Sequence, residues 1–204
     1  MDDHAVFRRG LKEILADEFR GTAFSEAGNA AEAFQHLHRQ EWDVVILDIS
    51  MPGESGLEVL KEAKRLRPRT VVLVLSMHSE DQYAVRVLRA GASGYLTKEM
   101  APERLVAAVR KTLSGGRYVS DSLAEKLALR LGSERDGPLH EALSDREYHV
   151  MCLIALGKTV TQIARELSLS VKTISTYRAR ILEKMKMKSN ADLIRYALEN
   201  SLQA

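Results

Sequence analysis

Residues 42–48 are WDVVILD, an apolar run that ends in a carboxylate. A second run, TVVLVLS at residues 70–76, is also continuous rather than alternating. Strands that are covered on both faces have this pattern, because neither face is left to water. Both runs therefore predict buried strands of a parallel sheet.

Two weaker strands and four helices extend this pattern. SGYLTK at residues 93–98 and TAFSEA at residues 22–27 also have strand character. Between the runs, apolar residues recur every three or four positions and predict helices, at residues 30–40, 56–66, 81–90 and 102–113. Alternating strands and helices predict an α/β domain, a parallel sheet with helices on both faces and right-handed connections.

Polar residues close three of these strands, at Asp48, Ser76 and Lys98. Taken singly, they could open a turn, cap a helix and lie on the surface. Ligands of such sheets bind outside the carboxyl ends of the strands, so together the three residues predict a site.

The acidic pair Asp2 and Asp3 would join this site if it follows a further strand. Three crowded carboxylates are costly unless a cation binds, and Mg²⁺ takes carboxylates, waters and phosphate oxygens. The implied chemistry is phosphoryl transfer onto Asp48.

Four motifs carry a family resemblance: DDH (residues 2–4), LDISMPGESG (47–56), LVLSMHSE (73–80) and AGASGYLTK (90–98). They resemble the receiver domain of bacterial response regulators of the NarL/FixJ family. The resemblance implies a flavodoxin-like sheet of order 2-1-3-4-5 and a sensor histidine kinase as phosphodonor. It also implies the site residues, which are Asp2, Asp3 and Asp48 for Mg²⁺, Asp48 as phosphoacceptor, Ser76 and Lys98 beside it, and Tyr95 as switch.

The implied mechanism is that phosphorylation draws Ser76 toward the phosphoryl group, that Tyr95 turns inward, and that the surface of the fourth helix and fifth strand changes. Glu99 stands where many receivers have proline, which leaves the isomer of the preceding peptide bond open.

The first receiver strand is the larger departure, because Met1 stands where one of its residues is expected. One interpretation is that the natural chain starts earlier and that an internal GTG codon or a cloning boundary was taken as its start. The other is a short chain with a rearranged receiver. In either case the neighbouring strands would have unpaired edges.

After residue 114 the pattern changes, because Gly115 and Gly116 end a helix. Residues 120–131 predict a short amphipathic helix with Leu123, Leu127 and Leu131 on one stripe, and residues 132–142 a flexible connection. The predicted division is a receiver domain at residues 1–114, a linker at 115–140 and an all-α domain at 141–204.

The all-α domain contains four predicted helices. Ser144 and Thr159 open capping boxes that Glu147 and Gln162 complete, and Ser170 and Ser189 are further predicted caps. Residues 161–185 form two helices around a tight turn, which is typical of a helix-turn-helix. Within residues 170–190, six basic side chains stand against Glu183 alone, a balance that favours phosphate contacts.

From LSDRE at residue 143 to NADLIRYA at residue 190, this domain resembles the LuxR-type DNA-binding domain. The resemblance implies a recognition helix at about 171–186 that enters the major groove of promoter DNA. Ser175, Thr176 and Ala179 would face bases, and Lys172, Thr173, Arg178 and Arg180 would favour phosphates. Leu193, Ile194, Ala197 and Leu198 would form the stripe that pairs two domains into a homodimer.

The remaining features fit a regulator rather than an enzyme. The single cysteine, Cys152, lies in an apolar run and predicts a buried thiol in a reducing compartment. No apolar stretch approaches the ~20 residues of a membrane span, so we expect the cytoplasm. A haloacid dehalogenase-type phosphatase would need a second aspartate where Ser50 stands. A receiver that binds proteins and not DNA is the other alternative.

Overall fold

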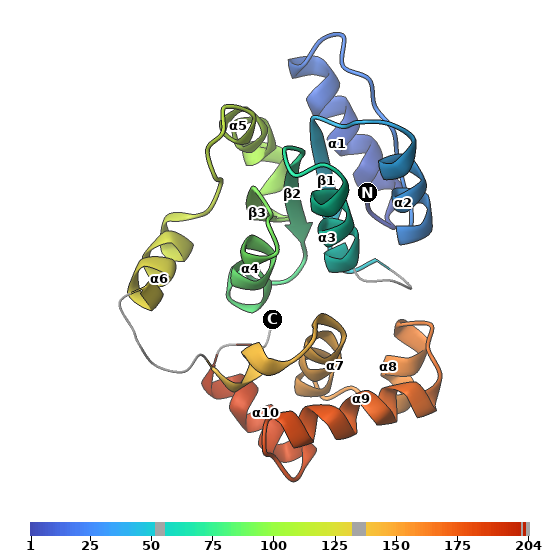
Figure 1. The fold of residues 1–204 in the computed structure, drawn as a ribbon, viewed down its shortest axis with the longest axis vertical. Coiled ribbons are helices and arrows are strands. Elements are labelled where there is room, and N and C mark those ends of the chain that lie inside the picture. Colours follow the sequence, from blue (N-terminus) through green and yellow to red (C-terminus); the bar gives the residue numbers. More distant parts are fainter. Residues whose placement is uncertain (52–55, 132–137, 201, 203–204) are drawn as a thin grey trace. The chain divides into compact units, whose positions relative to one another are not determined.

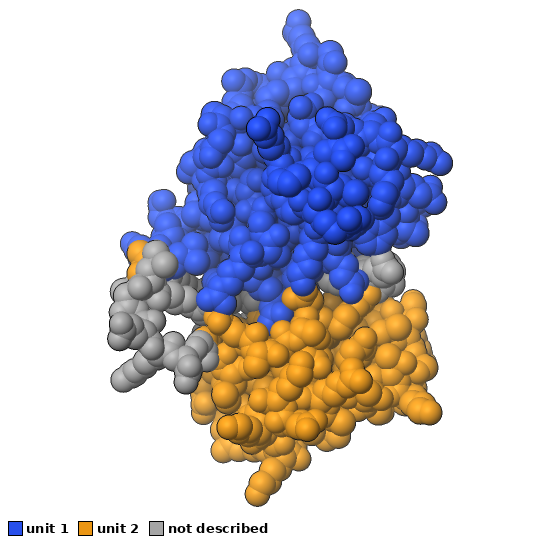
Figure 2. All heavy atoms as spheres, in the orientation of Figure 1, with its two compact units in different colours: residues 1–127 blue, residues 128–204 orange. Residues whose placement is uncertain are grey.

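The structure, a computed structural model, describes residues 1–51, 56–131, 138–200 and 202. The chain divides into two compact units, Met1–Leu127 and Ala128–Ala204, which have different colours in Figure 2. Both units contain buried apolar side chains, and they are described separately. Within the described ranges, no helix is both long and apolar enough to cross a membrane.

A parallel sheet forms the centre of the first unit. Among the described residues its strands are β1 (Val44–Asp48), β2 (Val71–Ser76) and β3 (Gly94–Thr97), in the order β1-β2-β3. The predicted α/β fold is confirmed. The helices of this unit, labelled in Figure 1, are α1 (Ala5–Glu18), α2 (Ala30–Arg39), α3 (Gly56–Leu66), α4 (Glu80–Arg89) and α5 (Ala101–Leu113). A further helix, α6 (Asp121–Leu131), begins in this unit and ends beyond Leu127.

Helices cover both faces of the sheet, as continuous apolar strands require. Leu73 and Leu75 of β2 and Leu96 of β3 share one core cluster with residues of α1 and α5. The alternate residues Val72 and Val74 are also buried. Among the other helices, α3 packs on β1 and α4 on β3, while α2 packs on α3.

Residues 22–27 are not a strand, so that prediction is wrong. A strand needs a neighbour, and only the first two residues lie between this segment and β1. The Asp2 N–H donates to Ala27 O at 3.0 Å, and the Met1 ammonium donates to Ile46 O at 2.9 Å. Burial lowers the pKa of this ammonium to about 6. Among the described residues, backbone pairing along this edge of β1 ends at Met1, so residues 22–27 have no regular backbone hydrogen-bond partner along their length.

The second unit is helical throughout its regular structure. Its elements are the 3₁₀ helix η1 (Leu139–Ala142) and the helices α7 (Asp145–Ala155), α8 (Val160–Glu166), α9 (Val171–Lys184) and α10 (Asn190–Glu199). The four predicted helices are thus confirmed. Helices α9 and α10 both pack on α7, and α8 packs on α9.

Side-chain caps set where these helices begin. Complete capping boxes join Ser144 to Glu147, Thr159 to Gln162 and Ser189 to Asp192. Ser170 caps α9 by accepting a hydrogen bond from the Thr173 N–H. All four predicted caps are confirmed, and each removes an unpaired backbone donor from a helix start.

Ile174 and Ile181 on one face of α9, and Met185 directly after its end, are buried. Between α8 and α9, Ser168 has a φ of 54°, which allows the chain to reverse over a few residues. Cys152 of α7 is buried as predicted, with 1% of its surface exposed.

The segment between the sheet and the helical unit is more ordered than predicted where the structure describes it. In α6, Leu123 is buried and Leu127 is half-buried, while the side chain of Leu131 and all of residues 132–137 lie outside the described part. Residues 139–142 form η1 instead of a flexible connection. His140 is buried there, with Nδ1 2.9 Å from the Tyr196 hydroxyl.

An ion pair between a buried carboxylate and an exposed lysine gives the helical unit a pH dependence that can be tested. The Lys184 ammonium lies 2.6 Å from Oε2 of Glu147, whose side chain is 4% exposed. Burial alone would raise the pKa of Glu147, but hydrogen bonds from Lys184 and Ser144 outweigh it and lower this pKa. The ionised form therefore stabilises the fold above the ordinary glutamate pKa of about 4.3, and this contribution is lost as the pH falls.

We expect Glu147→Gln to lower the free energy of unfolding of the helical unit by about 1–3 kcal/mol at pH 7, since the capping box survives but the ion pair does not. The difference from the unchanged chain should shrink toward pH 3. Thermal melts from pH 3 to pH 8 measure it, with Glu199→Gln on the exposed end of α10 as control. A difference that is constant with pH would contradict the ion-pair assignment.

Candidate functional site

A buried lysine joins two buried carboxylates at the carboxyl edge of the sheet. Nζ of Lys98, which follows β3, lies 2.7 Å from Oδ2 of Asp48 at the end of β1 and 2.7 Å from Oδ2 of Asp2. Asp2 and Asp48 are each 2% exposed and Lys98 is 8% exposed. The structure thus brings together three of the residues that the sequence predicts for this site.

Backbone groups fix the Asp48 carboxylate from the other side. Its Oδ1 accepts a hydrogen bond from the Ser50 N–H at 2.9 Å. Gly56, the first residue of α3, lies so close that a Cβ there would be 2.2 Å from Asp48 O, so a larger residue would displace the helix from the strand end. The Ser50 hydroxyl is buried with no hydrogen-bond partner among the described residues, which leaves one polar atom near Asp48 for a ligand or water.

Burial and pairing act on these charges in opposite directions. Burial raises the pKa of Asp48, and it outweighs the hydrogen bonds from Lys98 and Ser50. Burial alone would lower the pKa of Lys98, but its bonds to Asp2 and Asp48 raise it. Since one ammonium faces two carboxylates, the buried group carries a net negative charge when all three are ionised. A cation at the site removes this imbalance.

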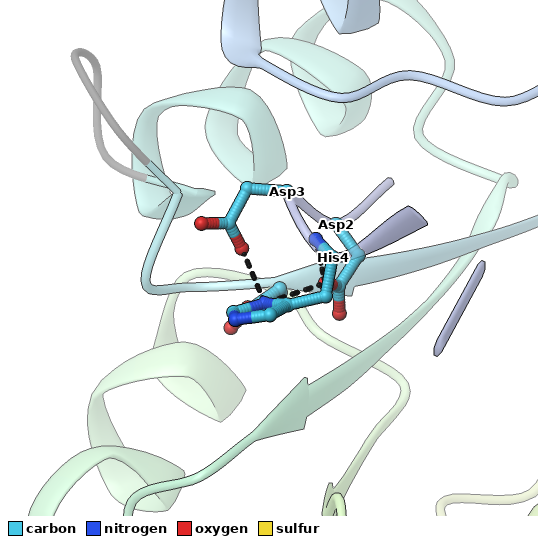
Figure 3. Close-up of side chains that lie close together, drawn as sticks. Asp2, Asp3 and His4 are labelled. Atoms are coloured by element: carbon cyan, nitrogen blue, oxygen red, sulfur yellow. Dashed lines mark hydrogen bonds and ion pairs between the residues drawn. The ribbon is translucent and has the colours of Figure 1, made fainter. Parts of the chain in front are cut away.

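Asp3 and His4 complete an acidic cluster around Asp2 (Figure 3). One ligand atom from each of Asp2, Asp3, His4 and Asp48 lies within 4.8 Å of the others. The His4 imidazole Nδ1 is 2.8 Å from Asp3 Oδ1 and 3.4 Å from Asp2 Oδ1. Three carboxylates at this spacing, of which Asp3 is the exposed one, are a donor set that suits Mg²⁺.

Ser76 and Tyr95 lie beside this cluster in the sheet. The Ser76 hydroxyl accepts a hydrogen bond from the His78 N–H at 3.0 Å, and the Tyr95 hydroxyl donates to His78 O at 2.8 Å. Both side chains have no exposed surface. Burial raises the pKa of the Tyr95 hydroxyl, although a hydrogen bond with Ser76 acts in the opposite direction. Tyr95 is therefore already turned inward in this structure, and the peptide bond after Lys98 is trans.

Phe7 is a site residue that the sequence analysis missed. Its ring centroid lies 5.0 Å from Nζ of Lys98, so the ammonium has an aromatic face as its third neighbour. The position of Phe7 in α1 gave no signal, because an aromatic residue on an amphipathic helix is usually a core residue. His4 of the DDH motif is a second site residue that was not predicted. Its residue type was a usable signal, since imidazole is a common metal ligand.

In the second unit, α9 presents a polar face opposite its buried one. Lys172, Ser175, Thr176, Ala179 and Arg180 are all exposed. The Ser175 and Thr176 hydroxyls donate to the carbonyls of Val171 and Lys172 at 2.9 and 3.0 Å. Short side chains flanked by two cations form a surface that can approach base edges closely while it contacts phosphates.

Two other predicted contact residues lie differently. Thr173 is half-buried, and its hydroxyl lies 2.7 Å from that of the cap residue Ser170. Arg178 is also half-buried, and its Nε donates to Asn190 Oδ1 at 2.6 Å, which links α9 to the start of α10. These residues support the local fold in addition to any contact with a ligand.

The predicted pairing stripe on α10 needs a correction. Leu193 and Ala197 have no exposed surface, because α10 packs on α7. Within the stripe, Leu198 is 59% exposed and Ile194 is half-buried. The apolar periodicity thus marks the side of α10 that faces the core of the domain. Of the four predicted residues, Leu198 and Ile194 are the ones with exposed surface that could contact another molecule.

The two units match two protein-family models. Residues 1–110 match the response regulator receiver domain, and residues 141–197 match the LuxR family of bacterial regulatory proteins. Over 203 residues the chain is 34% identical to the response regulator UvrY of Escherichia coli K12, covering 99% of this chain and 93% of UvrY. It is 35% identical over 208 residues to the oxygen regulatory protein NreC of Staphylococcus carnosus, covering 98% and 96%.

A solved structure is similar in both units. RcsB of Salmonella enterica serovar Typhimurium, bound to the promoter rprA in the presence of the phosphomimetic BeF₃⁻, matches with a TM-score of 0.64 and 27% identity. The match covers 96% of this chain and 94% of the RcsB chain.

We expect Phe7→Leu to slow phosphorylation of the chain by a small phosphodonor by roughly 2- to 30-fold, because it removes a cation–π contact worth about 0.5–2 kcal/mol. Phe7→Tyr keeps the ring face and should restore most of the rate. The time course of phosphate incorporation measures both variants, and their melting temperatures separate a lost contact from a lost fold. Equal rates in Phe7→Leu and the unchanged chain would show that the ring does not position Lys98.

Proposed function

The chain belongs to the two-component response regulators that join a receiver domain to a LuxR-type helix-turn-helix domain, and we propose how its own residues perform that function. Such a protein is a transcription regulator whose DNA binding is controlled by phosphorylation. The receiver domain is assigned to residues 1–114, the linker to 115–140 and the DNA-binding domain to 141–204. The phosphodonor is a sensor histidine kinase.

Asp48 is the phosphoacceptor in this proposal. The observation that carries it is the pair of 2.7 Å contacts that Lys98 makes with Asp48 and Asp2. A carboxylate oxygen of Asp48 attacks the phosphorus of the donor phosphohistidine, the P–N bond breaks, and an acyl phosphate forms. Lys98 holds the carboxylate in place and offers positive charge to the phosphoryl oxygens as they arrive.

The acidic cluster supports a divalent cation, which we assign as Mg²⁺ held by Asp2, Asp3 and Asp48. When it is bound, the ion neutralises charge on the phosphoryl oxygens. The Asp2 carboxylate accepts hydrogen bonds from His4 N–H and from Lys98, so its orientation is fixed before any ligand arrives. Asp3 lies at the open side, where exchange with solvent is possible.

Ser76 and Tyr95 carry the change away from Asp48. A phosphoryl group on Asp48 accepts a hydrogen bond from the Ser76 hydroxyl, which then leaves its present bond with the His78 N–H. Because the Tyr95 hydroxyl donates to His78 O, movement of this backbone segment changes the start of α4. The surface of α4 and β3 is therefore the one that we expect to respond.

DNA reading is assigned to the exposed face of α9. Ser175, Thr176 and Ala179 face the bases, Lys172 and Arg180 meet phosphates, and Thr173 and Arg178 contribute from the margin. Two copies of the chain would bind the two halves of a promoter site, with Leu198 and Ile194 as the available apolar residues of α10. The chain acts as a switch, and we assign no enzymatic turnover of a separate substrate to it.

Asp48→Asn should abolish stoichiometric phosphorylation by a small phosphodonor with Mg²⁺, together with the shift from monomer to dimer. Intact mass and size-exclusion chromatography with light scattering measure the two effects. Asp43→Asn, an exposed aspartate just before β1, is the matched control and should behave as the unchanged chain. An acid-stable, base-labile phosphate on Asp48→Asn would place the acceptor elsewhere.

Lys172→Ala and Arg180→Ala should weaken binding to all DNA sequences, and each should flatten the salt dependence by up to about one unit of slope. Thr176→Ala should change sequence preference instead, since its side chain faces bases. Filter binding to specific and random duplexes across a salt series measures these effects, with Lys61→Ala on α3 as control. Absence of DNA binding in the unchanged phosphorylated chain would favour a protein-interaction module.

A further inference from the structure

Hydrogen bonds hold the backbone of Asp2 as well as its carboxylate. The carboxylate accepts from the His4 N–H at 2.8 Å and from the Lys98 ammonium at 2.7 Å. The Asp2 N–H donates to Ala27 O at 3.0 Å. The remaining polar group is the Asp2 carbonyl, which accepts a hydrogen bond from Nη1 of Arg8 at 2.6 Å. Arg8 therefore completes the set of contacts that fixes this residue.

The Asp2 carbonyl belongs to the peptide group that joins Asp2 to Asp3. A peptide group is planar and rigid, so the direction of this carbonyl also sets where the Cα of Asp3 lies relative to Asp2. Both residues contribute a carboxylate oxygen to the cluster whose ligand atoms lie within 4.8 Å of one another. A rotation of this peptide group would therefore change the spacing of two of the three carboxylates assigned to the cation.

Glu26 holds the Arg8 guanidinium from another side. Nε of Arg8 donates to Oε2 of Glu26 at 3.3 Å. The Arg8 side chain is 17% exposed and the Glu26 side chain is 41% exposed. An ion pair with so exposed a carboxylate contributes little stability by itself. Its main consequence is to orient the planar guanidinium, whose Nη1 then meets the Asp2 carbonyl.

The first turn of α1 contributes two consecutive side chains to the site. The Arg8 N–H donates to His4 O at 3.1 Å as the helix begins. Side chains of a helix lean toward its N-terminus, so the side chain of Arg8 leads back toward residues 2–4. The neighbouring Phe7 contacts Lys98 from the same turn. Arg8 thus acts on the backbone of the acidic pair while Phe7 acts on the ammonium.

We propose that Arg8 is a positioning residue for the cation site: by holding the Asp2 carbonyl, it fixes the spacing of the Asp2 and Asp3 carboxylates. This inference rests on the proposed function, because it takes these carboxylates as the groups that hold Mg²⁺. The described hydrogen bonds of the Arg8 side chain go to Asp2 O and to Glu26, not to the carboxylates of the site. Arg8 therefore acts through the backbone.

This role predicts the opposite sign to a purely electrostatic one. Arg8 carries a positive charge, so removing that charge alone would strengthen the binding of a cation nearby. Losing the hydrogen bond to Asp2 O weakens binding instead, because partners that orient metal ligands typically contribute about 10- to 100-fold to affinity. The direction of the change in Mg²⁺ affinity separates the two effects.

The test compares Arg8→Met with Arg9→Met in the full chain. Arg9 is the next residue of α1 and is exposed, so Arg9→Met removes the same charge without removing the contact. Isothermal titration calorimetry with Mg²⁺, in the absence of phosphodonor, should give a dissociation constant about tenfold higher for Arg8→Met. The value for Arg9→Met should equal that of the unchanged chain or be slightly lower. Arg8→Lys keeps the charge and a donor for Asp2 O, and it should recover most of the affinity.

Melting temperatures in Mg²⁺-free buffer establish that each variant is folded at the titration temperature. If Arg8→Met does not fold, Arg8→Gln gives the same comparison, because it keeps a polar side chain at this half-buried position. A dissociation constant that is unchanged or lower in the Arg8 variant would overturn the inference and leave the cation assignment intact. An Arg8→Lys variant that binds as weakly as Arg8→Met would also overturn it. Absence of Mg²⁺ binding in the unchanged chain would refute the cation assignment, and this inference with it.

Discussion

The contact of Lys98 with Asp2 and Asp48 is the constraint on which the receiver domain depends. Removing three charges from water is costly, and the ammonium offsets this cost only while both carboxylates stay within hydrogen-bond distance. Asp48 ends β1, Lys98 follows β3, and Asp2 lies beside β1 at the start of the chain. The ion cluster therefore ties three separate backbone segments to one edge of the sheet. When all three groups are ionised, the cluster keeps a surplus negative charge, which a bound cation would neutralise.

The elements that could be predicted from the sequence are those whose signal is local. Apolar runs marked β1 and β2, and capping residues marked the starts of four helices in the second unit. The strand predicted at residues 22–27 does not form, because a strand there depends on a neighbour distant in sequence. The pairing surface predicted on α10 needed correction for a related reason. Apolar periodicity shows that Leu193 and Ala197 are covered, but it does not show which element covers them.

The residues of the candidate site likewise include some that the sequence could predict and some that it could not. Asp48, Ser76 and Lys98 were predicted from one topological rule, that parallel strands end at one edge. Phe7 could not be predicted, because its contact with Lys98 joins α1 to the end of β3 and an aromatic ring leaves no polar mark in the sequence. The pairing of Arg178 with Asn190 is likewise a contact between helices, and angle alone suggested only that Arg178 lies near the core side.

The buried cysteine of α7 has a practical consequence. Cys152 is the single thiol in the chain, and 1% of its surface is exposed. A thiol reagent can reach it only when the helical unit opens, because a buried cysteine is inert while the core is closed. The rate of thiol labelling therefore reports how often the DNA-binding domain opens. The measurement needs no engineered cysteine, and motions of the receiver domain do not contribute to it.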